Sequence, residues 1–172
     1  YDPTRDLTVV FGGRNASGRL DDTWVFDGTA WALKATATKP PARKDATLLF
    51  DPVRKQLMLL GGSKTGGVIA NDAWTFDGTD WKELVGQTAA PTPRVYQALS
   101  IDAKGRLWSV GGYDGARIHG DAAVFENGAW TQVTPTGPAP RFSAKLLRTG
   151  AERFLLVGGS TSDFSKTWFD FG

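Results

Sequence analysis

Side chains able to carry out chemistry are few in this sequence, and the densest group stands in one loop. The single histidine, His119, lies in the polar, glycine-rich stretch 113–121. There is no cysteine, which excludes disulfides, thiol nucleophiles and thiolate metal sites, and one histidine excludes a multi-histidine metal centre. His119 is expected to be either a solvated loop residue or a ligand contact. We assign no catalytic residue, metal or cofactor, and leave enzymatic activity open.

Three arginines are the better lead, because each follows a proline-bearing linker at the same point of a repeating pattern. They are Arg43, Arg94 and Arg141. The planar guanidinium fork carries five donors and suits carboxylates. Either the arginines bind an acidic ligand, or each one hydrogen-bonds neighbouring loop carbonyls once per repeat. Arg94, with Tyr96 nearby, and Arg141 are the better anion partners, since the anionic Asp45 follows Arg43.

The candidate binding residues comprise these arginines, nearby aromatic residues and the polar loop. The full set is Arg43, Arg94, Tyr96, Arg141, Tyr113, Asp114, Arg117 and His119. Three aspartates, Asp22, Asp72 and Asp121, also recur in register. Repetition argues against catalysis, so we expect these carboxylates to accept hydrogen bonds from loop backbone N–H groups.

The elements that must position these residues form an internal repeat of about 50 residues. Glycine doublets end four apolar runs, at Gly12-Gly13, Gly61-Gly62, Gly111-Gly112 and Gly158-Gly159. Tryptophan pairs follow the first two doublets, as Trp24/Trp31 and Trp74/Trp81, whereas the third repeat has Ala123 and Trp130 and the fourth reaches Trp168. A period of this length indicates a repeat architecture.

Each repeat predicts four short strands. In the second repeat these are residues 46–50, 56–60, 73–76 and 81–84. Asp51-Pro52 and Asp77-Gly78 are turn signals between them. Short, evenly spaced strands joined by turns predict an all-β meander. No window has sustained helical periodicity, and 21 glycines with 9 prolines argue against helices.

The first two repeats contain, in order, a glycine doublet, Trp-x-Phe, a second Trp and a linker of the form Pro-x-Arg or Pro-x-x-Arg. This order of motifs resembles the kelch repeat, and residues 72–81 are similar to bacterial kelch proteins. The resemblance implies a β-propeller built from four-stranded antiparallel blades. It implies little about function, because propellers host many unrelated activities. Bacterial kelch chains of this kind are often exported, so the resemblance also implies an extracellular or periplasmic location.

One kelch propeller segment, residues 1–172, is predicted, with an incomplete ring. Its parts are a partial blade at 1–34, blades at 45–85 and 95–134, and a partial blade at 142–172. Closed propellers use 4 to 8 blades, and an open arc leaves strand edges and apolar faces exposed. We expect a fragment of a larger propeller, completed by blades of the same or another chain. Two arcs joined into a ring, or a small four-bladed ring, are the alternatives.

The predicted topology places the long loops and the three arginines at one end of the channel. These loops are 14–20, 63–70, 113–120 and 160–166. Kelch domains commonly bind at this face, so the resemblance implies a mouth that binds a protein or an acidic or carbohydrate ligand. Composition argues against two further classes of function. No apolar run is long enough to span a membrane, and a net charge of +2 does not favour nucleic-acid binding.

The predicted function is a non-catalytic binding or scaffolding module acting at this mouth. One alternative is a sugar-acid-directed enzyme, of mutarotase or lyase type, that uses arginine and carboxylate groups at the same mouth. The other is a purely structural assembly component. A further expectation concerns the core: Trp108 would fill the volume that Ala123 leaves where other repeats carry tryptophan.

Overall fold

A computed structural model of the chain describes residues 1–133 and 137–161. Antiparallel strands make up nearly all of its regular structure, beside one single-turn 3₁₀ helix, η1 (Thr65–Gly67). Within those residues, no helix is long and apolar enough to cross a membrane. The predicted all-β class is therefore confirmed.

The described residues form five antiparallel sheets, and the four that follow the repeats succeed one another along the chain. The first sheet contains β1 (Thr8–Asn15), β2 (Gly18–Phe26) and β3 (Trp31–Leu33). The second contains β5 (Thr47–Asp51), β6 (Gln56–Leu60), β8 (Ala73–Phe76) and β9 (Trp81–Glu83). The third contains β10 (Ala98–Ile101), β11 (Leu107–Val110), β12 (Ala122–Glu126) and β13 (Ala129–Val133). The fourth contains β14 (Phe142–Arg148) and β15 (Phe154–Ser160).

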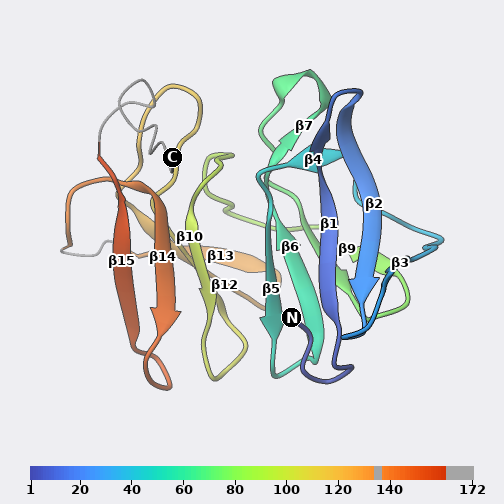
Figure 1. Ribbon diagram of the computed structural model, residues 1–172. Helices are drawn as coiled ribbons and strands as arrows, with labels where there is room; N and C mark the ends of the chain where they lie inside the picture. The colour runs from blue at the N-terminus through green and yellow to red at the C-terminus, as the bar shows by residue number, and fades with distance from the viewer. Residues whose placement is uncertain (134–136, 162–172) are drawn as a thin grey trace, which may run out of the picture.

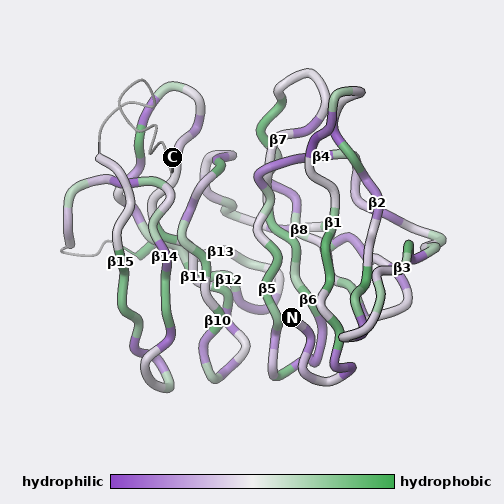
Figure 2. The backbone as a smooth tube through the Cα atoms, viewed as in Figure 1, coloured by the Kyte–Doolittle hydropathy of each residue, from purple (hydrophilic) through white to green (hydrophobic). Residues whose placement is uncertain are grey.

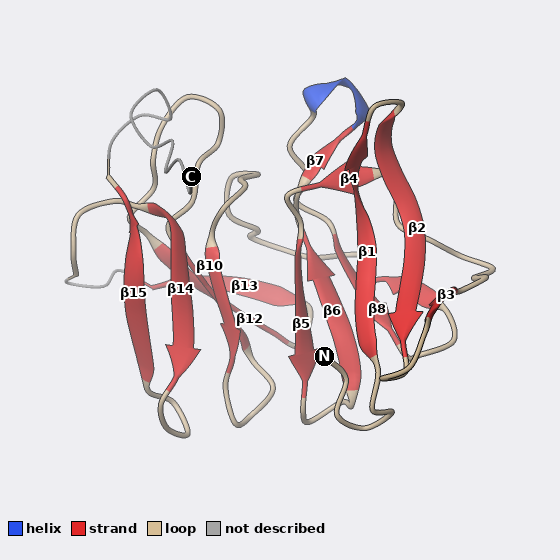
Figure 3. Ribbon diagram, viewed as in Figure 1, coloured by secondary structure: helices blue, strands red, loops and turns tan. Residues whose placement is uncertain are grey.

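The sheets stand side by side as an open arc (Figure 1), with the first sheet at one end and the fourth at the other. The innermost strand of the third sheet, β10, lies next to β5 of the second and β14 of the fourth. A short pair, β4 (Arg43–Lys44) with β7 (Ser63–Lys64), lies at the end of the molecule that also carries η1 (Figure 3). The strand predicted near Trp168 falls outside the described residues.

Turn chemistry explains where the strands stop. Asp27 follows β2, and its Oδ1 accepts hydrogen bonds from the backbone N–H groups of Thr29 and Ala30 at 2.8 and 2.9 Å. Asp77 caps the equivalent turn of the second sheet in the same way. An aspartate that bonds its own backbone two and three residues ahead closes a tight connection without help from the rest of the fold.

The core lies between neighbouring sheets, because each sheet presents apolar side chains on both faces. Between the first and second sheets it consists of Val9, Phe11, Leu57, Leu59, Trp74, Phe76 and Trp81. Between the second and third it includes Met58, Leu60, Leu99, Ile101, Leu107, Ala123, Phe125 and Trp130. Figure 2 shows the apolar stretches along the strands, with much of the hydrophilic sequence at the turns. The odd and even positions of a strand therefore face different neighbours.

Trp108 does not fill the space beside Ala123, so that expectation was wrong. Ala123 pairs with Ser109, whereas Trp108 pairs with Val124, and the two side chains therefore lie on opposite faces of the third sheet. Ala123 faces the second sheet. Trp108 faces the fourth, where its ring lies 5.5 Å from that of Phe154. Because side chains alternate along a strand, a shift of one position sends the indole to the other interface.

The glycine doublets end β6 and β11 as expected, but they lie inside β1 and β15. In β1 the ladder to β2 shifts register between Phe11 and Gly13 and then continues to the pair Asn15–Gly18. The connection is short enough there for the two strands to form one hairpin. In the second sheet residues 61–72 separate β6 from β8, and the ladder stops at the doublet.

Candidate functional site

Two arginines at the predicted channel mouth form bidentate ion pairs with aspartates of the same repeat. Arg43, 1% exposed, places Nη1 and Nη2 at 2.6 and 2.8 Å from the two oxygens of Asp72. Arg94 makes the same two contacts with Asp121. Bidentate contacts of this kind are the strong form of an arginine–carboxylate pair. We call these two units the arginine brackets.

The arginine of each bracket also donates hydrogen bonds to backbone carbonyls. The Nε of Arg43 donates to the carbonyl of Pro41 at 3.0 Å, and its Nη1 donates to the carbonyl of Gly61 at 2.9 Å. Arg94 repeats both contacts, with Thr92 and Gly111. The linker, the end of the second strand and the start of the third are therefore tied together in each sheet. This geometry favours the structural alternative for Arg43 and Arg94.

The bracket aspartates are ionised in the folded protein. Burial of Asp72 opposes ionisation, but hydrogen bonds from Arg43, Lys64 and Trp74 outweigh it and hold the pKa of this carboxyl well below its ordinary value. Burial also opposes ionisation of Asp121, and the bond to Arg94 lowers its pKa. The expectation that Asp22, Asp72 and Asp121 bond loop N–H groups is corrected. The main partners of Asp72 and Asp121 are the arginines, and Asp22 accepts a hydrogen bond from Nε1 of Trp24.

Arg141 occupies the third position of the series but has a different environment. Its Nε donates to the carbonyl of Ala139 at 3.2 Å and its Nη1 to that of Gly158 at 2.8 Å, so the backbone contacts are conserved between the repeats. Within residues 1–133 and 137–161, however, no carboxylate pairs with it. In the repeat register, Lys166 stands where the other sheets carry aspartate. Arg141 is half-buried.

The loop carrying His119 is an ordered turn. The side chain of Asp114 accepts hydrogen bonds from the N–H groups of Ala116 and Arg117, both at 2.8 Å. His119 is only 7% exposed: its Nε2 lies 2.7 Å from Asp114 Oδ2, and its Nδ1 lies 3.8 Å from Asp121 Oδ1. The expectation of a solvated histidine is therefore corrected. The ring joins the loop to the bracket of Arg94, and its two nitrogens face the protein's own carboxylates.

An open groove of about 460 Å³ lies over this loop. Its walls are Tyr113, Ala116, Arg117, Ile118, Ala139, Pro140 and Thr161, and we call it the mouth groove. The side chain of Arg117 is 72% exposed, and its Nε lies 3.6 Å from Asp114. Backbone N–H bonds, with a smaller effect of His119, hold the pKa of Asp114 well below its usual range. The groove is thus partly apolar and carries one well-exposed guanidinium.

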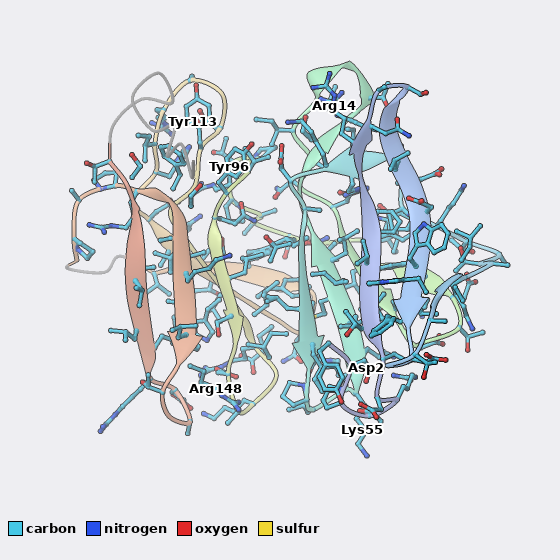
Figure 4. All side chains as sticks on the ribbon, in the orientation of Figure 1. Asp2, Arg14, Lys55, Tyr96, Tyr113 and Arg148 are labelled. Carbon is cyan, nitrogen blue, oxygen red and sulfur yellow. The ribbon has the colours of Figure 1, made fainter. Side chains whose placement is uncertain are left out.

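Two tyrosines link the mouth groove to the neighbouring sheet. The rings of Tyr96 and Tyr113 each lie 6.3 Å from that of Phe142. Burial, with the nearby Asp45 carboxylate, raises the pKa of Tyr96 to about 12. Figure 4 places Tyr96 and Tyr113 at the same end of the molecule, opposite Asp2, Lys55 and Arg148. The structure therefore gathers the predicted residues of the third repeat, whereas Arg43 lies apart from them, in the short β4–β7 pair.

A second series of aspartate–arginine pairs lies at the opposite end, and the sequence reasoning missed it. Asp51 is fully buried and bonds the Nη1 of Arg54 at 2.8 Å, while the same Nη1 donates to the carbonyl of Gly105 in the next sheet. Asp2 with Arg5, and Asp102 with Arg106, repeat this pairing. The signal was present, since Asp-Pro-x-Arg occurs at residues 2–5 and 51–54. These pairs hold neighbouring sheets together.

Among the described residues, no group of three or more His, Cys, Asp or Glu side chains could hold a metal ion. Comparison with known proteins identifies one family: the model of the KLHDC2/KLHL20/DRC7 Kelch-repeats domain matches residues 3–159. No curated protein matches the sequence. The match covers most of the chain and agrees with its antiparallel four-stranded sheets.

Proposed function

Because the chain belongs to the kelch-repeat family, whose domains generally serve protein interaction, we propose that it is a non-catalytic binding module. The bound group is an acidic segment of a partner protein, and it occupies the mouth groove. The observation that carries the proposal is the exposed guanidinium of Arg117 on an open, partly apolar wall. A carboxylate can reach this group without breaking any contact that holds the fold.

The division of labour among the arginines supports this assignment. In the two brackets the guanidinium groups are occupied by Asp72 and Asp121, so an incoming acid would have to displace a carboxylate at a high cost. Arg117 meets Asp114 only through its Nε, at 3.6 Å. Arg141 lines a different pocket, beside His119 and Phe154, and not the mouth groove. Arg117 is therefore the anion contact of the proposal.

The shape of the groove favours a peptide segment over a small sugar acid. Ala116, Ile118 and Pro140 offer apolar surface beside the charge, and Tyr113 adds an aromatic ring. Aromatic and apolar walls with a flanking arginine are typical of protein-interaction surfaces. A sugar acid presents a carboxylate but little apolar surface, so it would use only part of the wall.

The test is calorimetric titration with a glutamate-rich dodecapeptide containing two leucines, beside its glutamine counterpart and free glucuronate. We expect the acidic peptide to bind and the other two probes to bind at least tenfold more weakly. Arg117→Ala should reduce affinity about tenfold, the loss expected for a charge-assisted hydrogen bond.

Arg148→Ala is the matched control, because Arg148 is an exposed arginine at the opposite end of the molecule from Tyr113 of the groove wall (Figure 4). This variant should leave affinity unchanged. Equal losses in the two variants would mean that only net charge matters, and the groove assignment would fail. Tighter binding of glucuronate than of the peptide would favour the sugar-acid alternative.

A further inference from the structure

A cleft of about 470 Å³ lies between the second and third sheets, in the middle of the arc (Figure 1). We call it the inter-sheet cleft, and the residues that matter to its chemistry are Arg54, Gln56, Met58, Lys82, Phe125 and Asn127. The β5–β6 turn borders it, at the opposite end of the molecule from Tyr113 of the mouth groove (Figure 4). Its volume falls in the range of roughly 300–1,000 Å³ that is usual for small-molecule sites.

Side-chain alternation decides which polar groups of the second sheet reach the cleft. Across the ladder, Thr75 of β8 lies opposite both Met58 of β6 and Lys82 of β9. Met58 packs against the third sheet, so the Lys82 side chain lies on that side too. Glu83 lies opposite Trp74, which packs against the first sheet. The carboxylate of Glu83 is therefore directed to the other face of the second sheet.

The cleft carries two cationic groups with unused donors. Nη1 of Arg54 donates to the buried Asp51 carboxylate and to a backbone carbonyl of the β10–β11 turn, both at 2.8 Å. Its Nε and Nη2 have no partner among the described residues, and neither has the ammonium of Lys82. Glu126 follows Phe125, which faces the second sheet, so its carboxylate lies on the far face of the third. An anion in the cleft can therefore contact both cations without displacing a carboxylate.

The equivalent place between the first and second sheets is closed. There the side chain of Arg5 lies against Gly78, where a Cβ would overlap it. Counting back from the second tryptophan of each repeat, Asn127 stands where the second sheet has Gly78. Its side chain takes the space over which Arg54 would have to lie. The side chain of Arg5 is 31% exposed and that of Arg54 is 48% exposed. Replacement of one glycine thus leaves a guanidinium beside an open cleft.

The floor of the cleft is apolar. Met58 and Phe125 are both buried and come from its two sides, and Leu84 packs against the same core. A thioether and an aromatic ring favour a flat aromatic group between them. The amides of Gln56 and Asn127 have no side-chain partner among the described residues and can bond a polar substituent on that ring.

We propose that the inter-sheet cleft binds a small aromatic carboxylate, with its ring on Met58 and Phe125 and its carboxylate between Arg54 and Lys82. A phosphate ion would use the cations but not the floor, and a neutral ring would use the floor but not the cations. A carboxylate held by a guanidinium and an ammonium forms charge-assisted hydrogen bonds. This site is separate from the mouth groove, and the inference does not rest on binding of an acidic peptide there.

Calorimetric titration with 4-hydroxyphenylacetate tests the proposal, beside its neutral amide and free glucuronate. The aromatic acid should bind at least tenfold more tightly than either comparison compound. Lys82→Gln should weaken its binding about tenfold, the loss of one charge-assisted bond. Lys55→Gln is the matched control, because Lys55 is an exposed lysine of the β5–β6 turn that does not line the cleft, and it should leave affinity unchanged.

Backbone amide NMR locates the bound acid. The signals of Gly105 and Gly128, which line the cleft, should shift on titration, whereas that of Gly115 in the mouth loop should not. Arg117→Ala should leave binding of this probe unchanged. No binding at about 10 mM probe, equal binding of acid and amide, or full affinity in Lys82→Gln would each overturn the proposal. Loss of affinity in Arg117→Ala would overturn it too, because the probe would then occupy the mouth groove.

Discussion

Residues at equivalent positions behave differently in the middle of the arc and at its ends. In the second repeat Arg43 is buried against Asp72, and Trp81 is buried against the first sheet. Their equivalents are Arg141 in the fourth repeat, which has no carboxylate partner within the described residues, and Trp31 in the first repeat, which is exposed. The residue types are the same, and only the neighbours differ.

This difference teaches that a repeat position has no role of its own. An arginine of the linker closes a bracket when an aspartate of the same repeat is in reach, and it bonds backbone carbonyls when no described carboxylate is. A tryptophan is core when a neighbouring sheet covers it and is exposed when no described sheet does. Substitutions at matched positions can therefore test each assignment.

Gly62→Val should have the largest effect. Gly62 has φ +93°, and a Cβ there would lie 2.7 Å from the carbonyl oxygen of Lys44 and 2.9 Å from Ala46. Its equivalent, Gly13, has φ +112° but no atom within 4 Å of the same point. Backbone strain should destabilise Gly62→Val and the matched variant Gly13→Val by about 2 kcal/mol each. Steric overlap of the new side chain with Lys44 and Ala46 should destabilise Gly62→Val by about 2 kcal/mol more.

Urea denaturation measures the free energy of unfolding of the two glycine variants. The contrast should be a difference of about 2 kcal/mol between them, in addition to the loss that they share. Equal losses would show that backbone conformation alone restricts these positions. An unchanged urea midpoint for Gly62→Val would contradict the prediction.

Arg43→Ala should come next, with Arg141→Ala as its matched partner. Removing Arg43 leaves the carboxylate of Asp72 without its bidentate partner in a largely buried site, and we expect a loss of about 3 kcal/mol. Arg141→Ala removes two bonds to exposed carbonyls and should cost less than about 1 kcal/mol. Thermal and urea unfolding of both variants provide the measurement. Similar losses at the two positions would mean that the carboxylate contributes little to the bracket.

The smallest effect is the pH dependence of the bracket. The folded-state pKa of Asp72 is lowered, so its ionisation stabilises the protein above the unfolded-state pKa of about 4 and this contribution is lost as the pH falls through the folded-state value. The Asp72→Asn variant has no ionisable carboxyl at this position. The difference in free energy of unfolding between wild type and this variant should therefore become smaller below about pH 4. A difference that stays constant from pH 7 to pH 3 would contradict the assignment.

Much of the fold could be predicted from the sequence because its signals are local. Alternating apolar residues, Asp-Gly turns and the period of about 50 residues all act over a few neighbouring positions. The recurrence of Arg43 and Arg94, and separately of Asp72 and Asp121, was also visible. That these two series pair with each other was not, since the partners are 29 and 27 residues apart in the chain.

The location of the candidate site could be predicted from the sequence, but the environment of its individual side chains could not. The third-repeat loop was recognised from its polar composition, and Arg117 does line an open groove. His119 was expected in solvent, yet the folded loop buries it between Asp114 and Asp121. Its burial depends on the packing of the loop against the sheet, which residue type does not reveal.

The sequence by itself determined the class of the protein: strand lengths, turn positions and the repeat follow from short-range backbone preferences and alternation. Tertiary structure alone decided which arginines are occupied, which face Trp108 joins and which tryptophans remain exposed. These outcomes depend on long-range contacts, because the free energy of a buried charge or an aromatic ring depends on what covers it. Identical residues in successive repeats therefore come to lie in different environments.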